Sequence, residues 1–252
     1  MPKIYMMGCT FDSLSMAETV RIINASIKGQ KLLQHCVVNV AKIVHMARDP
    51  ELKVAVESCD IVNIDGMGVV FGARLLGYDV KERVAGIDLF HNLLALSQDE
   101  DYPVFFLGAR ADVVKQAAFA VQGKYPKLII AGCHHGYFSG REQEVVDQVR
   151  GSGARLLFVA MTSPIKEKFI ARWGAALGVH FVMGVGGTFD VVAGKVHRAP
   201  PWLQKIGFEW FYRALQEPRR LLGRYLKTNV IFFGLLSREL LNRIMCNAKK
   251  VR

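Results

Sequence analysis

Short apolar runs alternate with helix-like segments along residues 1–194, and this alternation limits the possible folds more than any other feature. The runs are continuously apolar, which is typical of strands buried on both faces of a sheet. They cover residues 3–7, 32–38, 61–65, 103–107, 128–131, 155–160 and 180–183. Such strands separated by helices predict an α/β fold, a Rossmann-like and mostly parallel sheet with helices on both faces.

Two of the helical segments carry recognisable starts. Asp49 followed by Pro50 predicts an N-cap and a first-turn proline. Asp88 predicts a cap for a helix over 89–97.

Polar and glycine residues follow several of the predicted strands. In a parallel sheet, ligands bind beyond the carboxyl ends of the strands, so we expect a site there. The candidate residues are Asn39, Asp65, Gly66, Gly108, Arg110, Tyr137, Ser163, Gly186, Gly187 and Asp190.

Asp65 ends the strand-like run 61–65, and glycines follow it. Two interpretations stay open from the residues alone. The carboxylate could cap the next helix, or it could act as a general base in the open space that the glycines leave. Arg83 is either a solvated loop cation or a contact to Asp65 or to a substrate phosphate. The segment 184–190, GVGGTFD, is not a GxGxxG fingerprint, but its backbone N–H groups beside a helix start favour phosphate.

Positive charge is concentrated at the C-terminal end. Residues 195–252 carry ten of the eleven net positive charges of the chain. The sequence therefore predicts a catalytic body over 1–194 and a basic, amphipathic helical appendage over 195–252, with Pro218 separating two helices. Arg213, Arg220, Arg224 and Lys227 have spacings that would place them on one face of a continuous helix. Interleaved aromatic residues suit a membrane interface.

Metal and disulfide chemistry find little support. The five cysteines are scattered without a CxxC, which favours a reducing cytoplasm, and we expect no signal peptide and no membrane span. The triplet Asp99–Asp101 matches a DxD metal signature but precedes a strand, so we interpret it as a solvated loop. His134-His135 lacks a neighbouring carboxylate or cysteine pattern and is interpreted as a polar loop.

Several longer motifs carry a family resemblance. They are GCTFDSLSMAETV, VVNVAKIVHMARDPEL, CDIVNIDGMGVV, RVAGIDLF, VFFLGAR, SPIKEKFI and GVGGTFDVVAGKVHRAPPWLQKIGFEWFYRALQEPRR. With these motifs the sequence resembles the WecG/TagA/CpsF family of glycosyltransferases over most of its length.

The resemblance implies a Rossmann-like fold of the GT-E type. It also implies inverting, metal-independent transfer of a hexose from a UDP-sugar to a polyprenyl-diphosphate-linked sugar, with no cofactor. Asp65 would be the general base, and Asn39 and Arg83 match active-site positions. The appendage would bind an anionic membrane surface, placing the enzyme peripherally on the inner face of the cytoplasmic membrane, with no nucleic acid as partner.

The leaving UDP gains negative charge, which helix N-termini and cations would have to stabilise in the absence of a metal. The appendage could supply the cations. The candidates are Arg198, Arg213, Arg219, Arg220 and Arg224.

Two positions depart from the commoner family pattern. Val37 stands where many members have threonine, and Lys166, a further candidate substrate contact, stands where many have glutamine. The lysine form resembles the exopolysaccharide, xanthan-type branch, which favours UDP-glucose as donor. UDP-N-acetylmannosamine and its uronic acid remain alternatives.

Two hypotheses from other classes also remain. One is a nucleotide-sugar oxidoreductase or epimerase, and the other is a non-catalytic basic module that binds membrane or nucleic acid.

Overall fold

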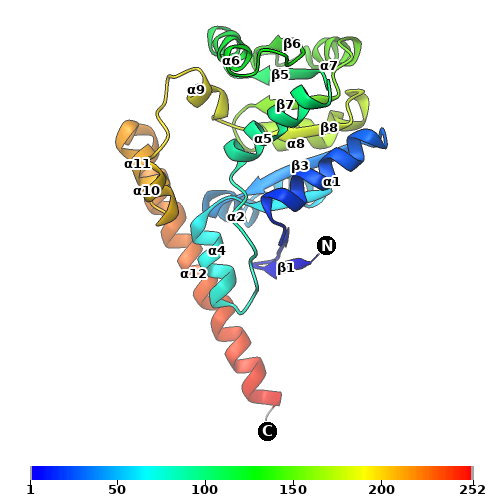
Figure 1. The fold of residues 1–252 in the computed structure, drawn as a ribbon. Coiled ribbons are helices and arrows are strands. Elements are labelled where there is room, and N and C mark those ends of the chain that lie inside the picture. The colour runs from blue at the N-terminus through cyan, green and yellow to red at the C-terminus, as the bar shows by residue number, and fades with distance from the viewer. Residues whose placement is uncertain (1, 251–252) are drawn as a thin grey trace.

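A six-stranded parallel sheet forms the centre of the body (Figure 1). The computed structural model describes residues 2–250, without the side chains of Lys205, Arg220 and residues 247–250. The sheet has the order β4-β3-β8-β7-β5-β6. Its strands are β3 Leu33–Val38, β4 Ile61–Ile64, β5 Val104–Gly108, β6 Ile130–His134, β7 Leu156–Ala160 and β8 Phe181–Gly184. The predicted α/β class and parallel sheet are confirmed.

The first apolar run does not enter this sheet. β1 (Lys3–Met6) pairs antiparallel with β2 (Cys9–Asp12), because Met7 and Gly8 both adopt positive φ and reverse the chain. The hairpin covers the edge strand β4, where the Asp12 Oδ2 atom accepts the Val62 N–H at 2.8 Å. The expectation that 3–7 is a strand is confirmed, but its place in the parallel sheet is wrong.

Helices cover both faces of the sheet. One face carries α1 (Met16–Lys28), α5 (Gly86–Asp99), α6 (Ala111–Lys124) and α9 (Thr188–Val192), and the other carries α7 (Glu142–Gly151) and α8 (Ile165–Trp173), which a turn at Gly174–Ala176 follows. Successive strand residues alternate between the two cores, as the pleat requires. Phe106 and Phe158 pack with Phe90 of α5, whereas Phe105 and Leu107 pack with α7.

Three helices cluster around β3 and β4: α2 (Val40–Met46), α3 (Pro50–Glu57) and α4 (Met67–Leu75). Asp49 caps α3 by accepting the Leu52 N–H at 3.0 Å, as its sequence predicts. The predicted cap at Asp88 is wrong, because α5 already begins at Gly86 and Asp88 lies in its first turn.

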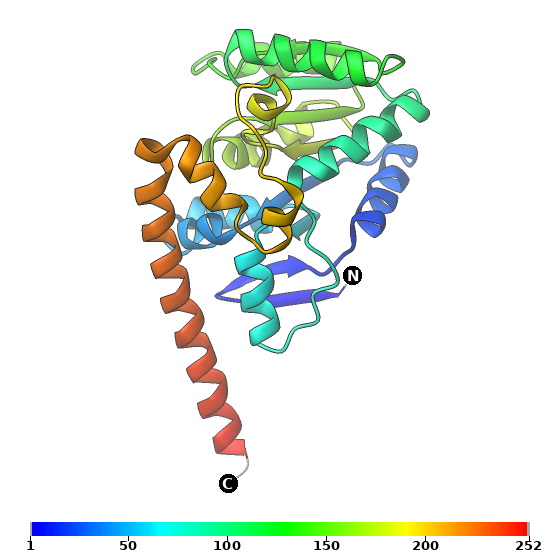
Figure 2. The same cartoon turned by 60° about the vertical axis from the view of Figure 1, so that its left-hand side comes forward.

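The chain leaves the body after α9 and ends in three helices, α10 (Pro201–Lys205), α11 (Glu209–Gln216) and α12 (Pro218–Lys250). Figure 2 shows α11 and α12 as a helical hairpin, with α12 running down past α2 and α4. The break at Pro218 is confirmed. Because α11 and α12 are separate helices that run in different directions, Arg213 and Arg224 do not share the face that a continuous helix would give them.

The middle of α12 packs directly on the body. Phe232 and Leu236 are buried against α4, where Gly72 allows the close approach of the two helices. Further along, Arg243 donates to the Leu76 carbonyl at 2.8 Å and to the Tyr78 hydroxyl at 2.8 Å. Among residues 2–250, no helix combines the length and the apolar character that crossing a bilayer requires.

We expect Gly72→Val to weaken the packing of α12 on α4. A Cβ at this position would lie 3.2 Å from the Phe232 ring, so a branched side chain forces the helices apart. Overpacking of this kind costs about 1–3 kcal/mol in the free energy of unfolding, measured by urea denaturation. Gly234→Val on α12 is the matched control, since a Cβ there meets nothing within 4 Å. Equal stabilities of the two variants would contradict this account of the contact.

Candidate active site

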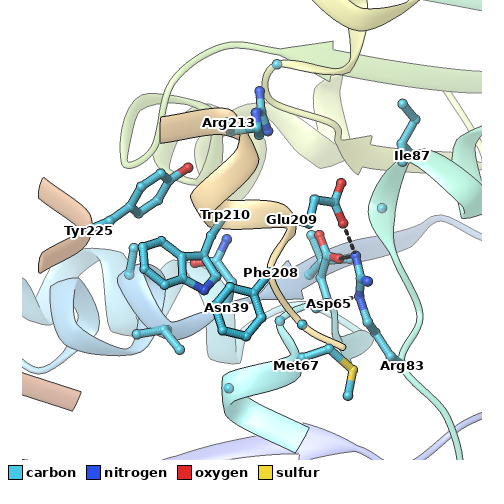
Figure 3. A pocket seen from close by; sticks show the side chains of 18 of the residues that line it. Asn39, Asp65, Met67, Arg83, Ile87, Phe208, Glu209, Trp210, Arg213 and Tyr225 are labelled. Atoms are coloured by element: carbon cyan, nitrogen blue, oxygen red, sulfur yellow. Dashed lines mark hydrogen bonds and ion pairs between the residues drawn. The ribbon is translucent and has the colours of Figure 1, made fainter. Parts of the chain in front are cut away.

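A cavity of about 440 Å³ lies where the carboxyl ends of β4, β3 and β8 meet the appendage. The body supplies residues from the ends of these strands and from the connection before α5, and the appendage supplies residues from α11 and α12. Figure 3 shows how their side chains face one another. The residues with polar side chains in the wall are Asn39, Asp65, Arg83, Thr188, His197, Arg198, Glu209, Trp210, Arg213, Tyr225, Thr228 and Asn229.

Asp65 follows β4 directly and turns its carboxylate into this cavity. It does not cap α4, whose N-cap is Gly66 and which receives no side-chain hydrogen bond there. Gly66 has no room for a larger residue, because a Cβ would lie 3.1 Å from that of Asn39. Burial raises the pKa of the Asp65 carboxyl, Arg83 lowers it, and Glu209 raises it. A carboxyl with a raised pKa is better suited to accept a proton than an ordinary aspartate.

Arg83 contacts Asp65 twice. Its Nη2 atom lies 3.3 Å from the Asp65 Oδ1 atom, and its Nε donates to the Asp65 backbone carbonyl. The same Nη2 donates to the Glu209 Oε2 atom at 2.7 Å. With 18% of its side chain exposed, Arg83 is not a solvated loop cation.

Two further arginines enter the wall from the C-terminal segment. Arg198 is held by Asp88 of α5 through Nη1–Oδ1 and Nη2–Oδ2 contacts of 2.5 and 2.7 Å. The Arg213 Nη2 atom would lie 2.9 Å from a Cβ on Gly187, so the glycine makes room for the guanidinium. The wall thus holds three guanidinium groups, of which Arg83 contacts Asp65. Such groups can bind a diphosphate while a carboxylate accepts a proton.

The other predicted residues divide into two groups. Asn39 lines the cavity and also caps α2, accepting the Lys42 N–H at 3.0 Å. Gly66 and Gly187 line it, while Gly186 and Asp190 adjoin Gly187. The described residues Gly108, Arg110, Tyr137, Ser163, Lys166, Arg219 and Arg224 do not line it, and the Arg220 side chain lies outside the described structure.

Several of the residues that do not line the cavity follow strands other than β3, β4 and β8. Gly108 ends β5, Tyr137 follows β6 and Ser163 follows β7, so they share the carboxyl edge with Asp65 but stand on other strands. Their proposed substrate contacts remain predictions. Arg219 and Arg224 are exposed on α12, where Arg224 lies over the Tyr225 ring.

Lys166 belongs to a buried charge cluster beneath the cavity. Its Nζ and that of Lys42 each lie 2.7 Å from the Glu167 Oε1 atom, and all three side chains are at most 8% exposed. The stem of Lys166 packs under Gly184, where a Cβ would lie 3.0 Å away. Lys166 is therefore paired with Glu167 and packed under the cavity wall.

Several contributors to the site were not predicted from the sequence, among them Asp88, Glu209, Trp210 and Tyr225. Only Glu209 left a clear signal, since an acidic residue is unusual within a basic and aromatic segment. The Trp210 and Tyr225 rings pack edge to face with centroids 5.8 Å apart, joining α11 to α12. Their place in the wall follows from the helical hairpin, which spacing alone does not reveal.

Among the described residues, no group of three or more His, Cys, Asp or Glu side chains is arranged to hold a metal ion. Asp99 ends α5, and Glu100 and Asp101 lead from it toward the amino end of β5; none of the three lines the cavity. Metal independence remains a prediction that needs a direct test.

An α/β body with a strand-end carboxylate facing arginines defines a candidate group-transfer enzyme with an anionic substrate. Comparison with known proteins gives its family. The family model described as "Glycosyl transferase WecG/TagA/CpsF family" matches residues 4–245, and the chain belongs to this family.

Two curated relatives are similar to the chain, and both are named N-acetylglucosaminyldiphosphoundecaprenol N-acetyl-beta-D-mannosaminyltransferase. The protein from Bacillus subtilis (strain 168) is 36% identical over 163 residues, which cover 65% of this chain and 63% of the relative. The protein from Bacillus spizizenii (strain W23) is 35% identical over 173 residues, which cover 69% of this chain and 67% of the relative. The chain thus matches about two thirds of the length of these relatives.

We expect Glu167→Gln to lower the free energy of unfolding by about 3–5 kcal/mol at pH 7, because two buried lysines lose their shared carboxylate. Lys42 and Lys166 hold the pKa of Glu167 at about 2, against an ordinary value of 4.5. The stability that ionised Glu167 contributes is thus complete above pH 4.5 and is lost as the pH falls toward 2. Urea denaturation over this range measures the difference between the variant and the wild type.

Glu51→Gln is the matched control. Glu51 also pairs with a lysine, Lys168, but 78% of its side chain is exposed, so the loss should stay below about 1 kcal/mol. Similar losses in the two variants would show that burial does not set the strength of the Glu167 cluster.

Proposed function

We propose that this protein is an inverting, metal-independent glycosyltransferase that moves a sugar from a UDP-sugar to a polyprenyl-diphosphate-linked sugar. The observation that carries the proposal is the Asp65 carboxylate in a cavity with Arg83, Arg198 and Arg213. In a single displacement, Asp65 takes the proton of the acceptor hydroxyl as its oxygen attacks the anomeric carbon and the bond to UDP breaks. The arginines stabilise the charge on the leaving diphosphate.

The names of the relatives support a proposal for the donor and the acceptor. Both are named as N-acetylmannosaminyltransferases acting on N-acetylglucosaminyldiphosphoundecaprenol, which favours UDP-N-acetylmannosamine as donor and a polyprenyl-diphosphate-linked N-acetylglucosamine as acceptor. The sequence-based preference for UDP-glucose, which came from Lys166 and its surrounding motif, finds no support in these relatives. A uronic acid donor is disfavoured because Lys166 is already paired with Glu167.

A donor screen in the presence of EDTA tests this function. We expect the mass of an N-acetylhexosamine to be added to synthetic polyprenyl-diphosphate-N-acetylglucosamine, with UDP-glucose and the uronic acid donor as comparisons. Asp65→Asn should lower turnover by about 10²-fold or more and keep UDP binding, because it removes the base and leaves the arginines in place. Product mass and calorimetric UDP titration provide the measurements.

Asp101→Asn is the matched control, since it alters the DxD-like triplet outside the cavity and should leave turnover unchanged. Unaltered turnover in Asp65→Asn would refute the base assignment. Activity that EDTA abolishes would refute metal independence, and binding of NAD(H) without sugar transfer would favour the oxidoreductase alternative.

We further propose that the appendage docks on an anionic membrane at the cytoplasmic face, where the lipid-linked acceptor lies. Leu222, Leu226, Val230 and Phe233 follow helical spacing along α12 and are exposed, 72% in the case of Val230. Arg219, Arg224 and Lys227 on the same helix are exposed as well. An apolar stripe with neighbouring cations suits a helix that lies in the membrane interface.

We expect the double variant Leu226→Glu with Val230→Glu to sediment several-fold less with vesicles that contain anionic lipid, because two apolar contacts are replaced by charges that anionic lipids repel. Phe119→Glu on α6 is the matched control, since that side chain is 82% exposed on the body. Equal sedimentation of the two proteins would contradict docking through α12.

A further inference from the structure

We propose that Glu209 is a positioning residue: with α11 docked over the cavity, its carboxylate holds the Arg83 guanidinium beside Asp65, so that the appendage completes the base. The inference rests on the proposed function, in which Asp65 is the group that accepts the proton. Asp65 and Arg83 both belong to the body, and Glu209 begins α11 of the appendage.

One nitrogen of Arg83 joins the two carboxylates. The Nη2 atom lies 2.7 Å from the Glu209 Oε2 atom and 3.3 Å from the Asp65 Oδ1 atom (Figure 3). Because a guanidinium is a planar group with fixed donor directions, a carboxylate on each side fixes both its position and its orientation. Without Glu209, only the contacts to Asp65 would remain to hold Arg83 in place.

The second oxygen of Glu209 faces another arginine. Glu209 Oε1 lies 3.8 Å from the Nε atom of Arg198, whose two terminal nitrogens already bind Asp88. The Arg198 Nε is buried and has no hydrogen-bond partner among the described residues. A small shift of α11 would bring Glu209 Oε1 within hydrogen-bond distance of the Arg198 Nε. Glu209 thus lies between Arg83, which Asp65 contacts, and Arg198, which Asp88 binds.

A helix start is a favourable place for any acidic residue, because the N-terminal end of a helix carries partial positive charge. This stabilisation of the helix start requires no partner residue, and a glutamate that points into solvent would also provide it. Glu209 instead has only 22% of its side chain exposed and bonds to a residue 126 positions earlier in the sequence. The side chain of Glu209 is therefore placed by its contact in the cavity. This contact can act on Asp65 or can only tether α11 to the body, and the two roles predict different effects of substitution.

The charges around the site predict how Glu209 acts on Asp65. Besides Glu209, the ionisable side chains in the cavity wall are Asp65 and Arg83 of the body, His197 and Arg198 of the connection, Arg213 of α11 and Tyr225 of α12. Asp88 of α5 pairs with Arg198. Arg83 lowers the pKa of Asp65, and the negative charge of Glu209 raises it. Glu209 therefore keeps Asp65 a stronger base than the arginine alone would allow.

Glu209→Gln isolates the charge, since the amide oxygen can still accept from Arg83. We expect the titration midpoint of the Asp65 carboxyl to move to lower pH, measured by carbon-13 NMR and assigned by its loss in Asp65→Asn. The acid limb of turnover should move in the same direction. Glu239→Gln is the control within the appendage, because Glu239 pairs with Arg243 outside the cavity and its loss should leave the Asp65 midpoint in place.

Glu209→Ala isolates the position, since no acceptor remains for Arg83. We expect kcat to fall about tenfold to hundredfold with little change in the KM of the donor, because a misplaced group near the reacting atoms slows the chemical step. Glu144→Ala on the exposed side of α7 is the control and should behave as the wild type.

An unmoved Asp65 midpoint in Glu209→Gln overturns the inference, even if Glu209→Ala loses activity, since Glu209 would then be only a tether. A kcat of Glu209→Ala equal to that of Glu144→Ala also overturns it. If no donor yields product, the proposed function fails, and the substrate-free NMR titration still decides whether Glu209 acts on Asp65.

Discussion

The Arg83 guanidinium lies between two carboxylates that come from distant parts of the chain, and the site depends on this contact. Asp65 follows β4 in the body, and Glu209 opens α11 in the appendage. All three side chains are mostly shielded from water, so their charges interact more strongly than they would on an exposed surface. The contact places a cation beside the Asp65 carboxylate and joins the appendage to the body.

The distribution of charge fits the same arrangement. The body is close to neutral, and the appendage is strongly basic. Arg198 and Arg213 reach the wall of the cavity that also holds Asp65 because the C-terminal segment folds back over the ends of β4, β3 and β8. A chain built this way can direct one basic segment toward an anionic surface and toward the diphosphate of a substrate.

Local sequence patterns did not determine every role in the structure. The capping role of Asp88 followed from local sequence, but Arg198, 110 positions later, binds its carboxylate. The spacing of Arg213 and Arg224 would place them on one face only of a continuous helix, and Pro218 begins a second helix that runs in another direction. Gly108, Tyr137 and Ser163 follow strands as Asp65 does, but their strands do not border the cavity, and their substrate contacts remain predictions. The start of each helix and the order of the strands in the sheet decided these outcomes, and the local pattern reveals neither.

The sequence by itself determined the class of fold, the strand that carries Asp65, the Asp49 cap and the family, because continuous apolar runs, caps and long motifs are local properties. It also located the positive charge in the last 58 residues, since charge is counted without a structure. Only the tertiary structure decided that Glu209 and Arg83 meet, and that Lys42 and Lys166 share Glu167 beneath the cavity. These outcomes depend on strand order and on helix docking, which bring together residues that no spacing along the chain connects.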